Sequence, residues 1–188
     1  MRRYHRNFSL CYLAAMKLNQ GAVNQGAAAG ALVVVMKLIA YLLGVAAYMS
    51  TIVAIGSMVF VIAGMCIACV GERKREGGLS FKGAFRIAWI AACVSSLLVL
   101  VFELILFSLV DPELAGNIAE FTMAKVEADL SGLMELPEEL QEETRASVTW
   151  WSGAMGKTVG SLFGLLFWGV IAAIVGATLK RDTANTIR

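Results

Sequence analysis

Charged side chains are scarce in this 188-residue sequence: lysine, arginine, aspartate and glutamate make up only 16% of it, against 59% hydrophobic residues. Soluble domains carry roughly a quarter of charged residues, so the composition excludes an ordinary soluble protein and is typical of an integral membrane protein. Histidine is almost missing, and the only one is His5. A single histidine argues against bis-histidine haem ligation, histidine-rich zinc sites and most nucleophile-and-base triads. We therefore expect no metal, no cofactor and no enzyme activity.

Cysteine is rare as well, with four residues in the whole chain. Cys66 and Cys69 form a C-x-x-C pair, but they occur at the end of an apolar helix rather than between a strand and a helix. A thioredoxin-like redox motif needs the strand-to-helix context. We therefore interpret the two cysteines as small apolar residues of a membrane helix.

Four long apolar runs account for much of the chain. Residues 27–48 would form a helix about 33 Å long at 1.5 Å per residue, which matches a hydrocarbon core of about 30 Å. Runs at 51–70, 87–110 and 158–179 are similar in length. The pattern predicts an all-α polytopic membrane protein with four transmembrane helices. The first turn, expected near residues 48–51, contains no Gly, Pro or Asn to mark it.

The segments between the spans are short, which indicates a single membrane domain over residues 26–179. Residues 1–25 are basic and mildly apolar, and we interpret them as a cytoplasmic surface helix. Residues 71–78 are expected to form a polar loop, followed by an amphipathic lead at 79–86. Residues 111–157 carry ten carboxylates together with apolar residues at near-helical spacing, and they predict an acidic helical hairpin outside the cytoplasm.

Positive charge is segregated along the chain. Twelve of the sixteen lysines and arginines lie before the first span, between the second and third spans, or in the tail at 180–188; three carboxylates accompany them, so this side has a net charge of +9. The opposite side has three basic residues and ten carboxylates, a net charge of −7. Basic loops stay in the cytoplasm. We therefore expect both termini in the cytoplasm and the protein in a bacterial inner membrane.

Lys37 and Glu103 are the ionisable residues that lie well inside the predicted spans. A charge near a helix centre costs roughly 2.5 to 3.5 kcal/mol. Lys37 would lie about 15 Å and Glu103 about 24 Å from the cytoplasmic ends of their helices, a difference that a lysine side chain can largely bridge. We expect an ion pair between the first and third spans. It is either a structural pair or part of a proton or ion relay, and the sequence favours the structural interpretation.

Glycines repeat at four-residue spacing in two places. Gly156, Gly160 and Gly164 occur around the start of the fourth span, and Gly26 and Gly30 occur at the start of the first. Such spacing lets two helix backbones approach closely. We expect these glycines to pack helices within the chain, in preference to forming a homodimer.

Two stretches that flank the third span carry a family resemblance. They read GGLSFKGAFRIAW before the span and FSLVDPEL at its end. They resemble a family of small bacterial inner-membrane proteins known only as a domain of unknown function, over roughly residues 24–179. The resemblance implies a four-helix membrane domain and brings no established activity or catalytic residue. The positions that look like the family, all expected to be structural, are Gly78, Phe81, Phe85, Asp111 and Pro112.

These observations favour an accessory or interaction subunit of a membrane complex, in contact with the lipid bilayer and with another membrane protein or envelope component. No nucleic acid is expected as a partner. The alternative is a small transporter or proton-coupled permease that uses Lys37 and Glu103. A membrane enzyme acting on a lipid-linked substrate would need an interfacial carboxylate such as Asp111 or Glu113, and nothing in the sequence singles these out.

Overall fold

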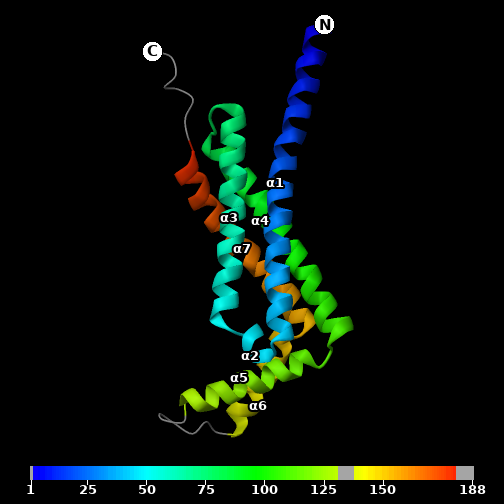
Figure 1. The fold of residues 1–188 in the computed structure, drawn as a ribbon, viewed down its shortest axis with the longest axis vertical. Helices are drawn as coiled ribbons and strands as arrows, with labels where there is room; N and C mark the ends of the chain where they lie inside the picture. Colours follow the sequence, from blue (N-terminus) through cyan, green and yellow to red (C-terminus); the bar gives the residue numbers. More distant parts are fainter. Residues whose placement is uncertain (1, 131–137, 181–188) are drawn as a thin grey trace.

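The computed structural model describes residues 2–130 and 138–180, and this part of the chain is a series of helices joined by short loops (Figure 1). In order along the chain these are α1 (Arg2–Leu42), α2 (Val45–Tyr48), α3 (Thr51–Glu76), α4 (Phe81–Ile105), the π-helical turn η1 (Leu106–Val110), α5 (Leu114–Leu130), α6 (Glu138–Ser152) and α7 (Ala154–Leu179).

Four stretches of helix are long and apolar enough to cross a bilayer, as predicted. They are Gln20–Leu42, Thr51–Glu76, Phe81–Val110 and Met155–Leu179. The chain is therefore an all-α, multi-pass membrane protein whose environment is the lipid bilayer. Most side chains that point away from the bundle are large and apolar, as contact with lipid requires.

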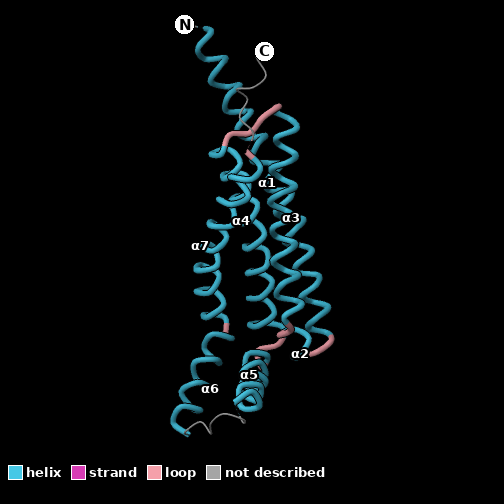
Figure 2. Tube along the Cα trace, turned by 90° about the vertical axis from the view of Figure 1, so that its left-hand side faces the viewer, coloured by secondary structure: helices cyan, strands magenta, loops and turns pink. Residues whose placement is uncertain are grey.

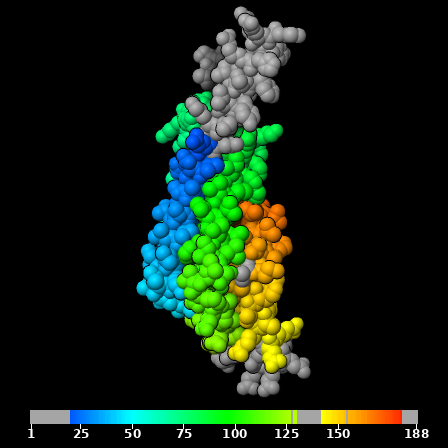
Figure 3. Space-filling model, turned by 90° about the vertical axis from the view of Figure 1, so that its right-hand side faces the viewer, coloured from blue at the N-terminus to red at the C-terminus, as the bar shows by residue number. Residues whose placement is uncertain are grey.

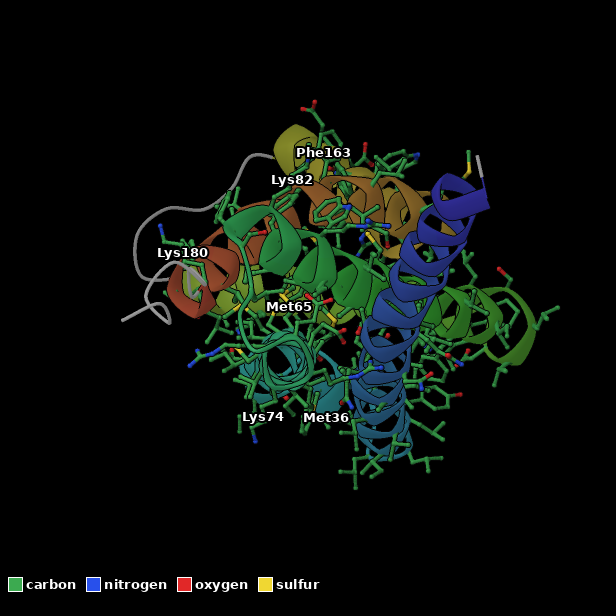
Figure 4. The ribbon with its side chains drawn as sticks, turned by 90° about the horizontal axis from the view of Figure 1, so that it is seen from above. Met36, Met65, Lys74, Lys82, Phe163 and Lys180 are labelled. Atoms are coloured by element: carbon green, nitrogen blue, oxygen red, sulfur yellow. The ribbon has the colours of Figure 1, made fainter. Side chains whose placement is uncertain are left out.

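The four spans lie side by side; α5 lies across one end of them, and α6 extends beyond the same end from α7 (Figures 1 and 2). The start of α1 and the end of α7 are at the opposite end. α4 contacts α1, α3 and α7, and it lies between α1 and α7 on the face shown in Figure 3. Met65 lies in the middle of the bundle, fully buried, whereas Phe163 and Lys74 project outward (Figure 4).

Small residues bring α1 and α4 into close contact. A Cβ atom on Gly26 would lie only 2.5 Å from the carbonyl oxygen of Ala91, and one on Gly30 would lie 3.0 Å from the Cα of Ser95. The Ser95 hydroxyl donates a hydrogen bond of 2.7 Å to the carbonyl of Gly26, which replaces the side-chain packing that glycine cannot supply. Backbone approach of this kind is a main source of helix association in lipid.

The glycines at the start of α7 do not show the close helix packing that their four-residue spacing predicts. A Cβ atom on Gly160 or Gly164 would meet nothing within 4 Å. Gly156 packs against the preceding turn of its own chain, where a Cβ would lie 2.4 Å from the carbonyl oxygen of Trp150. α7 instead approaches α4 further along, at Gly169 beside the Trp89 ring and at Gly176 beside the Phe85 backbone.

The first turn falls earlier than the sequence predicts. α1 ends at Leu42, and Gly44 has a φ of 104°, a conformation that favours glycine. The short helix α2 follows, and the Ser50 hydroxyl caps α3 by accepting a hydrogen bond of 3.4 Å from the Val53 amide.

At its other end α1 runs unbroken from Arg2, so the predicted N-terminal segment at 1–25 does not form a helix separate from the first span. No proline occurs between this segment and the span to interrupt the helix.

The loop between the second and third spans is shorter than predicted. α3 continues to Glu76, and Gly77 ends it in the left-handed region with a φ of 72°. The basic residues of the predicted loop form the last helical turn, where positive charge is favourable against the helix dipole. Ser80 then caps α4, which starts at Phe81 and includes most of the predicted amphipathic lead.

The segment after the third span contains two helices, α5 and α6, packed against each other. Their placement outside the cytoplasm stays a prediction. Residues 131–137, which include Glu135 of the predicted acidic hairpin, lie outside the described part of the chain.

We predict that Gly26→Ala destabilises the protein, because its methyl group would overlap the Ala91 backbone. Overpacking of this size typically costs about 1–3 kcal/mol. Gly160→Ala is the matched control, since its methyl group meets open space. Thermal unfolding in detergent should show a lower midpoint for Gly26→Ala and an equal or higher one for Gly160→Ala. Equal midpoints for both variants would contradict the close approach of α1 and α4.

Candidate functional site

The structure brings Lys37 of α1 and Glu103 of α4 together in an ion pair, in which the Lys37 ammonium donates to Oε1 of Glu103. The side chains are 19% and 8% exposed. Lys37 lies about 26 Å from the start of its span at Gln20 and Glu103 about 33 Å from Phe81, because both helices begin earlier than predicted. The pair is therefore nearer to the end that carries α5 and α6 than to the middle of the bundle.

A third charge, Lys157 of α7, lies beside this pair. The sequence placed Lys157 in the far-side segment, but the fourth span begins at Met155 and so includes it. Lys157 is close enough to Glu103 and Lys37 to interact electrostatically with both. Its ammonium lies 5.2 Å from the centre of the Phe107 ring, a favourable cation–π distance. Three helices thus contribute two positive charges and one negative charge to one region.

Tyr48 of α2 and Phe107 of η1 cover the pair on the side of α5. The Lys37 ammonium lies 5.8 Å from the centre of the Tyr48 ring, and the two aromatic rings meet edge to face at 6.3 Å. Tyr48 is only 7% exposed, and its hydroxyl has no hydrogen-bond partner among the described residues. Burial, followed by the negative charge of Glu103, raises the pKa of Tyr48. The hydroxyl therefore stays neutral and retains a proton to donate.

A cavity of about 160 Å³ begins at Lys37 and is bounded by all four spans. It is large enough to hold water. Ser57 and Ser95 at its wall donate hydrogen bonds to backbone carbonyls. Gly164 contributes to the open space because it has no side chain to fill it. The lining residues are Val33, Lys37, Ser57, Val61, Ser95, Ser96, Val99, Ser161, Gly164 and Trp168.

A second cavity of about 320 Å³ lies between α4 and α7. Its lining is mostly apolar, and Leu97 and Leu162 are 61% and 62% exposed, so it is open to the bilayer. We call it the α4–α7 groove. Ser96 and Ser161 line both this groove and the cavity at Lys37, so the two spaces adjoin at these residues. The lining residues of the groove are Cys93, Ser96, Leu97, Leu100, Ser161, Leu162 and Leu165.

The family-like positions have structural surroundings. Asp111 accepts a 3.2 Å hydrogen bond from the Tyr41 hydroxyl, which joins the end of α1 to the chain leaving η1, just before Pro112. At the other end, Phe85 stacks between Phe81 and Trp89, with ring centres 6.4 and 6.2 Å apart. Gly78 is buried in the loop before α4.

Glu72 forms a second buried carboxylate away from this site. It is paired with Arg75 one turn later on α3, at 3.2 Å. A Cβ atom on Gly21 of α1 would lie 3.6 Å from Glu72 Oε2. The described part of the chain contains no group of three or more His, Cys, Asp or Glu side chains arranged to hold a metal ion.

The sequence did not predict that several residues, described next, belong to the site. Lys157 was missed because the predicted fourth span started one residue after it. Tyr48 was assigned to the end of the first span, and its role depends on the turn at Gly44. Cavity-lining serines give no periodic signal, although their occurrence in apolar helices is a clue that could have been used.

With this geometry the protein is a multi-pass α-helical membrane protein with a charged site between its spans. Residues 24–181 match the family described as protein of unknown function DUF4199, so the chain belongs to that family. The match includes the ion pair, Lys157 and both cavities. No curated protein and no solved structure matches the chain.

We predict an asymmetric cost for breaking the ion pair. Glu103→Gln leaves two lysines without their carboxylate, whereas Lys37→Met leaves Lys157 to compensate Glu103. Removing one partner of a buried pair costs on the order of 3 kcal/mol. Thermal unfolding should show a larger loss for Glu103→Gln than for Lys37→Met, and Lys37→Met with Glu103→Gln should cost less than the sum of the two. Equal, additive losses would show that the pair does not stabilise the fold.

Proposed function

We propose that this protein is a non-enzymatic accessory or interaction subunit of a complex in a bacterial inner membrane, with both termini in the cytoplasm. The strong segregation of charge along the chain supports this orientation, since it puts +9 on the side of the termini and, with Lys157 inside its span, −8 on the side of α5 and α6. Membership of a family with no assigned activity is compatible with such a role.

One observation carries the proposal. α5 and α6 extend beyond the spans (Figures 1 and 2), and together with the residue just before α5 they expose five described carboxylates against two basic residues. A helix pair with a net negative surface charge, held at the end of a membrane bundle, is suited to bind a basic segment of another envelope protein. We call this the acidic surface, and its exposed carboxylates are Glu113, Glu120, Asp129, Glu142 and Glu143.

The test is purification of the full-length chain from its native host after crosslinking. The unaltered chain should recover a stoichiometric partner, and Glu142→Lys with Glu143→Lys should reduce that recovery at least fivefold at low salt. Lys74→Glu, a charge reversal at the opposite end of α3, is the control and should leave recovery unchanged. A clean monomer from the unaltered chain would refute the proposal.

The same protein tests the orientation. In a chain without its native cysteines, a membrane-impermeant thiol reagent applied to intact cells with a permeabilised outer membrane should label Glu142→Cys but not Lys74→Cys. Labelling of Lys74→Cys alone would place the acidic surface in the cytoplasm.

A second candidate is a small transporter or proton-coupled permease. The cavity at Lys37 favours it, because ion and substrate pathways run through polar space between membrane helices. The Lys37→Met and Glu103→Gln variants also distinguish a proton or ion relay from a structural ion pair. Loss of coupled uptake or proton flux in the double variant, with folding retained, supports the relay; normal function in the double variant leaves the pair structural.

A further inference from the structure

The region around the ion pair has one positive charge in excess. The described side chains form two ion pairs, Lys37 with Glu103 and Glu72 with Arg75, and Lys157 belongs to neither. Lys157 lies on the same helical face as Ser161, one turn before it, and Ser161 lines the cavity. Lys157 therefore adds positive charge beside the Lys37 end of the cavity, in a low-dielectric surrounding where an uncompensated charge is costly.

Hydrogen-bond donors accompany this charge. The Tyr48 hydroxyl is buried and donates to no described residue, and the centre of its ring lies 5.8 Å from the Lys37 ammonium. A buried hydroxyl without a partner costs on the order of 1–3 kcal/mol. An anionic oxygen in this region would gain from the excess charge and could accept from such a donor. Charge and hydrogen bonding therefore select the same class of ligand group.

The access route is lateral rather than through the ends of the bundle. The cavity adjoins the α4–α7 groove at Ser96 and Ser161, and the groove opens to lipid beside Leu97 and Leu162. Figure 3 shows the face on which α4 and α7 lie side by side. A molecule already dissolved in the bilayer can reach the serines from this groove without crossing water.

We propose that the cavity and the α4–α7 groove together bind a single-chain anionic amphiphile of the bilayer, a fatty-acid carboxylate. The carboxylate lies at the end of the cavity near Lys37 and Lys157, and the hydrocarbon chain lies in the groove. The cavity at Lys37, about 160 Å³, is large enough for a carboxylate. The groove is formed between only two helices, which suits one chain. This inference does not depend on the docking role of the acidic surface.

The experiment uses the full-length chain in phospholipid nanodiscs with a diazirine-bearing hexadecanoic acid, and the matching alcohol as the neutral probe. Mass spectrometry of photolabelled peptides should locate the acid on α4 and α7, within a turn of Leu97 and Leu162. The acid should label at least fivefold more than the alcohol, and unlabelled hexadecanoic acid should compete. Equal labelling by the two probes would show that the groove makes only non-specific contact with lipid, and it would overturn the proposal.

Two variants separate binding from folding. Gly164→Leu should fill the cavity without a backbone clash and reduce labelling by the acid at least fivefold, because a Cβ atom there meets nothing within 4 Å. Gly71→Leu is the same change at an exposed glycine whose surroundings are equally open, and it should label normally. Lys157→Met should abolish the preference for acid over alcohol. Full labelling in Gly164→Leu would show that the cavity is not used.

Discussion

The close approach of α1 to α4 is the contact on which the rest of the bundle depends. Lipid supplies no hydrophobic driving force for helix association, so the two helices must gain from backbone proximity and from polar contacts. Gly26 and Gly30 provide the proximity near one end, with the Ser95 hydroxyl bonded to a backbone carbonyl. The Lys37–Glu103 pair joins the same two helices near the other end. Contact at both ends fixes α1 and α4 as the pair against which the other spans pack: α3 packs against both of them, and α7 packs mainly against α4.

The same constraint explains where the bundle is open. α7 approaches α4 closely only from Gly169 onward, and the turns before it present Gly160 and Gly164 to empty space. Glycine therefore has opposite effects on the two sides of α4. Between α1 and α4 it removes a side chain so that backbones can touch, and on α7 it removes a side chain that would otherwise fill the cavity beside Lys37. The charged site and the open space occur together because both lie where α7 is not held by backbone contact.

The number and class of the spanning helices could be predicted from sequence because bilayer thickness imposes a length that composition reveals directly. Helix ends were less predictable. Polar residues at the end of α3 were assigned to a loop, although Gly77 rather than the charge at Arg73 ends the helix. The contact between Lys37 and Glu103 followed from the cost of buried charge, while Lys157 and Tyr48 required the exact positions of two turns. Cavities depend on how helices splay, which no periodic pattern encodes.

The position of the charged site has a consequence for its electrical behaviour. A full elementary charge moved across the membrane couples to about 2.3 kcal/mol per 100 mV. Lys37 and Glu103 are opposite charges at nearly the same depth, so their contributions to the work against the transmembrane voltage cancel. Lys157 lies about 3 Å inside its span, roughly a tenth of a 30 Å core, which leaves about 0.2 kcal/mol per 100 mV. The charged site therefore holds three ionisable groups while remaining almost indifferent to membrane potential.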